Sequence, residues 1–294
     1  MTPEVPVLVT GAAGNVGVGV VRGLLARGLP VRAADLDVRV LGDRAPGAAA
    51  VHLDLTDPTT FAPTLRGVRR VFLIRPPSIA RVGPTLNRFL DVAVAEGVEH
   101  VVFSSVAGAE TNRVVPHHRV ERHLIASGLG WTMLRPGFFA QNLATAYRQD
   151  VVRDARVHVP AGQGKVAFID VRDLGEVAAQ VLADPAPHRG LGYTLTGPEA
   201  ITFYDVATVL TNELGRPVRY EPASVLGYLR HLGRQGLPVP QRLVQTVLHT
   251  GLRRGDAETV DPTLEQLLGR RPHTLADYVR DHRNLWAPTA PTRG

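Results

Sequence analysis

Three glycines near the start of the chain have the spacing of a phosphate-binding turn. They directly follow a short apolar segment, Val7–Thr10. In such a turn the first glycine permits a sharp bend, the second lets backbone approach a pyrophosphate, and the third lets the next helix pack closely. Free N–H groups at the start of that helix bind the anion without a lysine. The expected contact residues are Gly11, Ala13, Gly14, Asn15, Val16 and Gly17.

The G-x-x-G-x-x-G spacing is one residue longer than the common G-x-G-x-x-G fingerprint, so the glycines alone are weak evidence for a nucleotide site. The strands and helix around them are therefore needed to interpret them. Val16, Val20 and Leu24 recur at helical spacing, and Val31–Ala34 follows as a second strand. The result is a β-α-β unit. A glycine-rich turn without a ligand is the alternative. A P-loop is excluded, because no Gly-Lys-Ser/Thr follows and Lys165 is the chain's only lysine.

Two aspartates follow expected strands and are candidate contacts of the adenosine half of a dinucleotide. Asp35 stands 18 residues after Gly17, where a carboxylate accepts hydrogen bonds from a ribose. Its charge would repel a 2′-phosphate and so weakly favours NAD(H) over NADP(H), although Arg32 and Arg39 are close enough to reverse this preference. Capping of the next turn is the alternative role of Asp35. Asp54 is positioned to accept a hydrogen bond from the adenine amino group.

A hydroxyl candidate ends another expected strand, and a common catalytic pair is missing. Ser104 is placed to position a substrate carbonyl, although an ordinary strand-end serine is an equally good interpretation. Short-chain dehydrogenases use a Tyr-x-x-x-Lys pair, in which lysine lowers the tyrosine pKa for proton transfer. None of the six tyrosines here has a lysine four residues later. Chemistry that needs a strong proton donor is therefore disfavoured.

Strand and helix patterns alternate through the first half of the chain. The further expected strands are Val51–Leu53, Val68–Ile74, Val98–Phe103 and Trp131–Leu134, and the clearest helices are Ile79–Glu96 and Pro116–Ser127. This alternation predicts an α/β protein with a doubly wound parallel-sheet Rossmann fold, in which ligands bind at the carboxyl ends of the strands.

The remainder of the chain predicts a smaller, mainly helical C-terminal substrate domain. We expect residues 1–136 with about 165–185 to form the dinucleotide-binding domain, and 137–164 with about 186–286 to form the smaller substrate or interaction domain, before a tail at 287–294. Val166–Ile169 reads as one more sheet-like strand. Two apolar stripes are expected to pack inward. They are Val225, Leu226, Leu229 and Leu232, then Leu243, Val244, Val247, Leu248 and Leu252.

Composition narrows the function classes. The absence of cysteine removes disulfides, thiolate nucleophiles and cysteine-bound metals. We expect no metal site, because His117, His118 and His123 lack metal-ligand spacing. The net charge is +6, but the arginines are scattered, which argues against a nucleic-acid surface. No secretory signal or apolar run of the ~18 residues that a membrane helix needs is recognisable, so we expect a cytoplasmic protein with no membrane partner.

Several longer motifs together resemble the NmrA-like family of atypical short-chain dehydrogenase/reductase proteins. They are Thr10-Gly-Ala-Ala-Gly-Asn-Val-Gly, Phe103-Ser-Ser-Val, the stretch from Glu121 to Phe139, Phe168-Ile-Asp-Val-Arg-Asp, Tyr193-Thr-Leu-Thr-Gly-Pro and the C-terminal Gly269-Arg-Arg-Pro. The resemblance covers nearly the whole chain and includes NAD(P)H:quinone reductase and azoreductase-like members. It implies an adenosine contact near Asp54 and Leu55. It also implies a nicotinamide pocket near Arg75, Pro76, Ser104, Pro136 and Phe139.

The chain departs from the family pattern at two positions. Many relatives carry an arginine after the second strand to hold a 2′-phosphate, where this chain has Asp35-Leu36. Many also carry a lysine four residues before the helix glutamate, where this chain has His117. Histidine can donate a hydrogen bond or a proton near neutral pH, so His117 is a catalytic candidate. Ser104, with its hydroxyl at the end of a strand, is the other. An ordinary helix-start histidine is the alternative.

The sequence leaves two classes of function open. The first is an NAD(P)H-dependent oxidoreductase that passes hydride to a quinone-like or similar small acceptor, which needs little proton donation from the enzyme. The second is a non-catalytic NAD(P)-binding redox sensor that acts through a protein partner, which the missing Tyr-x-x-x-Lys pair favours. Sugar-nucleotide epimerase-like chemistry is a weaker third reading. A homo-oligomer is compatible with any of them.

Overall fold

The computed structural model describes residues 5–287, which form two compact units. The sheet unit comprises the described residues through Pro136, Val171–Leu195 and Gln266–Gly269. The helical unit comprises Gly137–Asp170, Thr196–Glu265 and the described residues from Arg270 on. None of the helices within 5–287 is long and apolar enough to cross a membrane.

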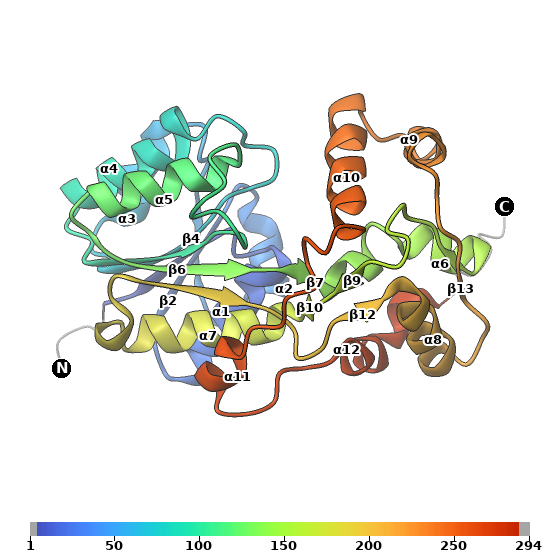
Figure 1. Cartoon of the computed structure of the whole chain (residues 1–294). Helices are drawn as coiled ribbons and strands as arrows, with labels where there is room; N and C mark the ends of the chain where they lie inside the picture. The colour runs from blue at the N-terminus through green and yellow to red at the C-terminus, as the bar shows by residue number, and fades with distance from the viewer. Residues whose placement is uncertain (1–4, 288–294) are drawn as a thin grey trace, which may run out of the picture. The chain divides into compact units, whose positions relative to one another are not determined.

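A parallel seven-stranded sheet forms the centre of the sheet unit (Figure 1), in the order β11-β6-β5-β4-β1-β2-β3. Its strands are β1 Val7–Thr10, β2 Val31–Asp35, β3 Ala49–His52, β4 Arg70–Ile74, β5 His100–Ser104, β6 Gly130–Pro136 and β11 Leu191–Leu195. The strand order reverses direction between β1 and β4. In open α/β sheets this switch point, at the carboxyl ends of the strands, is where ligands bind.

Helices cover both faces of the sheet, as the doubly wound prediction requires (Figure 1). One face carries α1 Asn15–Ala26 and α7 Val171–Ala183, which pack against each other. The other carries α3 Phe61–Leu65, α4 Arg88–Ala95 and α5 Pro116–Ala126, whose apolar side chains share one buried core with the sheet. The short helix α2 Leu41–Arg44 follows β2. The expected Rossmann-like α/β fold is confirmed.

The seventh strand was not expected, and a strand that was expected lies outside this sheet. Leu191–Leu195 pairs with β6 at the sheet edge, although residues 186–195 were assigned to the smaller domain. Its partly exposed residues and Gly192 hide the pattern of a buried strand. Val166–Ile169 is broken at Ala167, whose N–H donates to the Ala257 carbonyl instead of a sheet partner. It therefore belongs to the helical unit.

The helical unit is built from helices and three two-stranded pairs (Figure 1). The pairs are β7 Phe138–Phe139 with β10 Phe168–Ile169, β9 Lys165–Val166 with β12 Ile201–Thr202, and β8 Arg156–Val157 with β13 Arg219–Tyr220. The helices include α6 Arg148–Asp154, α8 Phe203–Leu214, α9 Val225–Arg234, α10 Val239–Leu252 and α12 Leu275–Asp281, and α11 Thr263–Leu268 leads back to the sheet unit. Its core gathers aromatic side chains around Phe203.

The inward packing expected for the two apolar stripes is wrong for most of their residues. Leu226 on α9 is mostly exposed, and so are four residues of α10, namely Leu243, Val244, Val247 and Leu248. Leu232 and Leu252 are buried as expected. The reason is that α10 directs Thr246 and His249 inward, so the opposite, apolar side faces out.

Candidate nucleotide-binding and active site

The glycine turn follows a strand whose four residues are fully buried. Gly11 has φ +60°, a conformation that side chains disfavour, and a Cβ there would lie 2.7 Å from Ile74 Cγ2. Gly17 is tighter still, because its Cβ would lie 2.2 Å from the Gly11 carbonyl oxygen. Thr10 fixes the strand end, since its hydroxyl oxygen accepts a hydrogen bond from the Ile74 N–H at 3.0 Å. The turn therefore has the close packing that its spacing predicted.

The first turn of α1 is suited to bind an anion. Gly14 is its N-cap and supplies no side-chain cap, and no acidic residue lies in the first turn. Val18 donates the first hydrogen bond of the helix, to the Gly14 carbonyl at 2.9 Å. The N–H groups of Asn15, Val16 and Gly17 therefore have no partner within the helix, and the positive end of the helix dipole lies at the same place. This arrangement fits a pyrophosphate.

Asp35 ends β2 and is tied to the glycine turn. One carboxylate oxygen accepts a hydrogen bond from the Ala13 N–H at 2.9 Å, and the other accepts one from the Leu36 N–H at 2.8 Å. The alternative role, capping of the local backbone, is therefore present. Each oxygen keeps a second lone-pair direction, so a ribose contact is compatible with this geometry.

The arginines near Asp35 are arranged differently from the sequence expectation. Arg32 turns away and donates to the Thr64 and Arg66 carbonyls. Arg39 forms two side-chain hydrogen bonds with Asp37, and these bonds hold the pKa of Asp37 at about 2. Arg44, which sequence reasoning missed, donates from Nε to the Ala13 carbonyl at 3.1 Å. Arg44 is thus the arginine that contacts the glycine turn itself.

Asp54 and Leu55 lie just after β3, each with a local structural role. One oxygen of Asp54 accepts hydrogen bonds from the N–H and the hydroxyl of Thr56, at 2.8 and 2.7 Å. The Leu55 side chain is buried in the core of the sheet unit. A contact of Leu55 with a nucleotide would therefore involve its backbone. The Asp54 side chain is half-buried and so remains partly accessible.

The sheet register brings the remaining polar candidates of the sheet unit into one row. Ile74, Ser104 and Leu134 are partners across β4, β5 and β6. The residues that follow them, Arg75, Ser105 and Arg135, therefore lie together at the carboxyl edge. Pro136 ends β6, and its carbonyl accepts a hydrogen bond from the Ala107 N–H.

Arg75 and His117 form a direct contact in this row. Arg75 donates from Nε to His117 Nε2 at 3.2 Å, and its Nη1 donates to the carbonyls of Pro76 and Ile79. Burial, together with the nearby charge of Arg75, lowers the pKa of His117 to about 4. His117 is therefore neutral near pH 7. Because Nε2 accepts a hydrogen bond, Nδ1 carries the ring proton and can donate a hydrogen bond.

A buried ionic group beside His117 was not found from the sequence. Glu121 on α5 accepts two hydrogen bonds from Arg135, at 3.0 and 2.8 Å, and a third from the Ser105 hydroxyl at 2.6 Å. Glu110 lies 3.3 Å from Arg135 as well. The hydrogen bond to Glu121 raises the pKa of Arg135. Only an i, i+4 relation of Glu121 to His117 was visible in the sequence, because its partners come from other elements.

One of the sequence candidates, and the chain's only lysine, are not part of this row. Phe139 belongs to β7 of the helical unit, where it is the register partner of Ile169. Lys165, the only lysine, is exposed in β9. Across residues 5–287 no group of three or more His, Cys, Asp or Glu side chains is arranged to hold a metal ion.

A doubly wound sheet, a glycine turn at its switch point and a helix start suited to an anion define a dinucleotide-binding protein with a Rossmann fold. The model of the NmrA-like family matches residues 3–282. The chain belongs to this family.

Several relatives at 26 to 31% identity are named as NAD(P)H-dependent reductases or quinone oxidoreductases. The NAD(P)H azoreductase of Xenophilus azovorans is 31% identical, with 94% of this chain and 97% of the relative covered. Quinone oxidoreductase 2 of Escherichia coli is 27% identical, with 93% and 97% covered. The structure of the E. coli NADPH-dependent quinone oxidoreductase with NADPH matches with a TM-score of 0.84 at 26% identity, covering 94% of this chain and 99% of that one. The expected class, an NAD(P)H-dependent oxidoreductase, is confirmed over the non-catalytic sensor.

Proposed function

We propose that this protein reduces a quinone-like or similar small acceptor with a nicotinamide dinucleotide as hydride donor. The names of its relatives support this acceptor class. The observation that carries the proposal is the glycine turn running into a helix start whose first N–H groups have no partner within the helix. A bound dinucleotide supplies the hydride, and the residues of the chain bind and orient it.

The main-chain N–H groups of Asn15, Val16 and Gly17 would hold the pyrophosphate, and the side chains around them would select the adenosine half. Asp54, next to β3, would accept a hydrogen bond from the adenine amino group. Asp35, fixed by two backbone N–H groups, would accept a hydrogen bond from the ribose.

We further propose a preference for NAD(H) over NADP(H). The Asp35 carboxylate is held at the end of β2, where a 2′-phosphate would meet its charge. Arg32 points elsewhere, and Asp37 offsets the charge of Arg39. Arg44 is the cation that opposes this preference, because it contacts the same turn.

The polar row at the sheet edge suits an acceptor that needs no strong acid. His117 is neutral near pH 7 and can donate a hydrogen bond from Nδ1. Such a bond would orient an acceptor oxygen without transferring a proton to it. The Ser104 hydroxyl is a second candidate for that oxygen. A missing general acid typically costs roughly a hundredfold to ten-thousandfold in rate, which disfavours carbonyl reduction. A reduced quinone takes its protons from water.

The experiment is steady-state oxidation of NADH and NADPH with a panel of quinones, azo dyes and simple ketones. We expect turnover with quinones and little with ketones. Tight cofactor binding without turnover on any acceptor would contradict the proposal and favour the sensor. His117→Gln keeps a hydrogen-bond donor and acceptor and should retain most activity, whereas His117→Phe should lower kcat with quinones.

A further inference from the structure

Helix α10 is amphipathic, but its apolar side is exposed and its polar side faces the core of the helical unit. The five large aliphatic residues on its outer side are 53 to 67% exposed. They are Val239, Leu243, Val244, Val247 and Leu248. Val239, Leu243 and Val247 follow one another at i, i+4 spacing, and Val244 and Leu248 form a parallel row beside them, so all five share one side of the helix. We call this surface, together with exposed Leu226 of α9, the apolar face.

Polar contacts on the opposite side hold α10 in this orientation. His249 is buried, and its Nε2 lies 2.5 Å from the Tyr147 hydroxyl, while its Nδ1 contacts the Gln245 carbonyl at 2.7 Å. Because Nδ1 faces a carbonyl, it carries the proton, and Nε2 accepts from Tyr147. A rotation that buried the aliphatic residues would leave His249 and Tyr147 without these partners, which buried polar groups do not tolerate.

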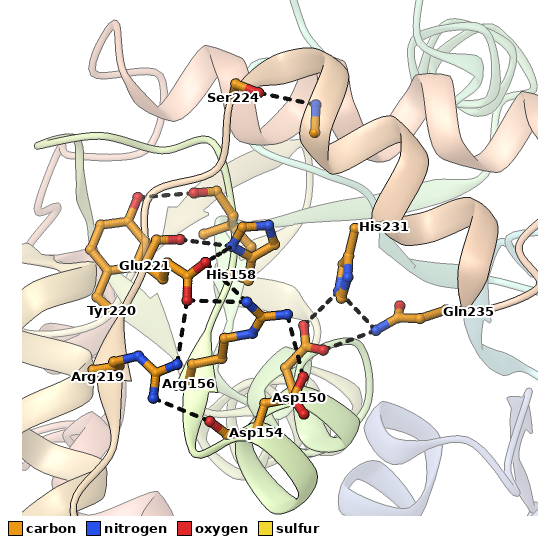
Figure 2. Close-up of polar contacts among 12 residues, drawn as sticks. Asp150, Asp154, Arg156, His158, Arg219, Tyr220, Glu221, Ser224, His231 and Gln235 are labelled. Atoms are coloured by element: carbon orange, nitrogen blue, oxygen red, sulfur yellow. Dashed lines mark hydrogen bonds and ion pairs between the residues drawn. The ribbon is translucent and has the colours of Figure 1, made fainter.

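Helix α9 is held in the same way. Figure 2 shows His231 of α9 and Gln235, the C-cap of that helix, directed at Asp150 of α6, which is buried. His231 Nε2 lies 2.8 Å from one Asp150 oxygen, and Gln235 donates to the other at 3.2 Å. The outward orientation of the apolar face is therefore fixed by specific polar contacts within the helical unit.

The chain segment that carries the apolar face has charges of one sign. Between Pro222 and Gly255 the chain has five arginines and no aspartate or glutamate. Four of the arginines are exposed, namely Arg230, Arg234, Arg253 and Arg254. The carboxylates that flank this segment along the chain are Glu221, which pairs with Arg156, and Asp256, which lies 3.9 Å from Arg254. A cluster of exposed aliphatic side chains on a soluble surface marks an interaction site, and arginines without carboxylates select a negatively charged partner.

Three kinds of partner differ in how they would meet this surface. A second copy would bring identical arginine-rich rims together, which costs free energy by repulsion. A nucleic acid would satisfy the arginines but not the aliphatic side chains, and the face has no aromatic residue for base stacking. An anionic lipid bilayer satisfies both, because aliphatic side chains enter the acyl boundary while arginines meet the headgroups.

We propose that the apolar face of α9 and α10 docks on the surface of an anionic lipid bilayer. The helices lie on the surface and do not span it. This inference goes beyond the proposed reductase function and does not depend on it. It is an alternative to the expectation that the protein has no membrane partner.

Flotation of the full chain with vesicles tests this docking without measuring turnover. We expect binding to phosphatidylcholine vesicles that contain phosphatidylglycerol, weak binding to pure phosphatidylcholine, and loss of binding as NaCl is raised. Leu243→Gln plus Val247→Gln should lower partitioning at least roughly tenfold, because two buried aliphatic groups are lost. Arg230→Gln plus Arg234→Gln should lower it roughly fivefold per arginine.

Matched controls change the same residue types elsewhere. Val94→Gln plus Val114→Gln, and Arg88→Gln plus Arg122→Gln, alter exposed residues of the sheet unit and should leave vesicle binding unchanged. Equal binding to neutral and anionic vesicles, or equal binding of wild type and the α10 variant, would overturn the proposal. A wild-type dimer in sedimentation that the α10 variant abolishes would assign the face to a second copy and overturn it too. Specific binding of an acidic protein, without binding to vesicles, would also overturn the proposal.

Discussion

Arg75 donates a hydrogen bond from Nε to Nε2 of His117, at 3.2 Å, across the carboxyl edge of the sheet. This contact fixes the His117 ring with its proton on Nδ1. It also opposes protonation, since an imidazolium would face the guanidinium. His117 is thus a neutral hydrogen-bond donor.

The first prediction concerns the pH dependence of stability. The pKa of His117 is about 4 in the folded protein, against 6.5 for an ordinary histidine. Below pH 6.5 the unfolded chain takes up a proton that the folded protein does not, so the free energy of unfolding falls as pH drops toward 4. The contribution is at most about 3 kcal/mol. Urea unfolding of wild type and His117→Gln between pH 7 and 4 checks this, and the variant should lose less stability on acidification. Exposed His52→Gln should behave as wild type.

The second prediction concerns the buried ionic group. Glu121→Gln removes the charge that pairs with Arg135 and weakens the contact with Ser105. Breaking a buried ion pair lowers the free energy of unfolding by about 3–5 kcal/mol. We expect a loss near about 3 kcal/mol, because Arg135 keeps its contact with Glu110. Glu99→Gln breaks an exposed pair with Arg69 and should cost less than about 1 kcal/mol. Equal urea midpoints for the two variants would show that the buried group contributes nothing beyond a surface pair.

The third prediction concerns cofactor preference. Asp35→Asn removes the negative charge near the ribose while keeping one acceptor for Ala13 or Leu36. The ratio of kcat/KM for NADPH to that for NADH should rise roughly tenfold, as expected for removal of one repulsive charge. Arg44→Gln should change the ratio in the opposite direction. If neither variant moves the ratio, Asp35 and Arg44 have no part in cofactor selection.

The fourth prediction concerns the orientation of α10. Tyr147→Phe leaves His249 Nε2 buried without its donor and should destabilise the protein by about 1–3 kcal/mol. Tyr204→Phe changes an exposed tyrosine and is the matched control. Thermal unfolding measures both, and a negligible effect at Tyr147 would mean that its hydrogen bond does not hold the helix.

The sequence allowed prediction where the signal is local. The glycine turn, the strands β1 to β6 and helix α5 depend on neighbouring residues, and all were found. The group of Ser105, Glu121 and Arg135 was missed, because only the sheet register brings its members together. Strand β11 was missed because an edge strand lacks a buried pattern. The stripe of α10 was recognised, but periodicity shows only which side is apolar and not that this side faces the core.

Equilibrium binding of NADH and NADPH to the Gly17→Ala variant tests the central claim most directly. A methyl group at Gly17 would lie 2.2 Å from the Gly11 carbonyl oxygen, so it must displace the turn that would hold the pyrophosphate. Gly42→Ala adds the same group where nothing lies within 4 Å. Fluorescence titration should show at least a tenfold loss of affinity for Gly17→Ala, which corresponds to the loss of roughly one charge-assisted hydrogen bond. The affinity of Gly42→Ala should be unchanged. Unchanged affinity in a folded Gly17→Ala variant would contradict the account.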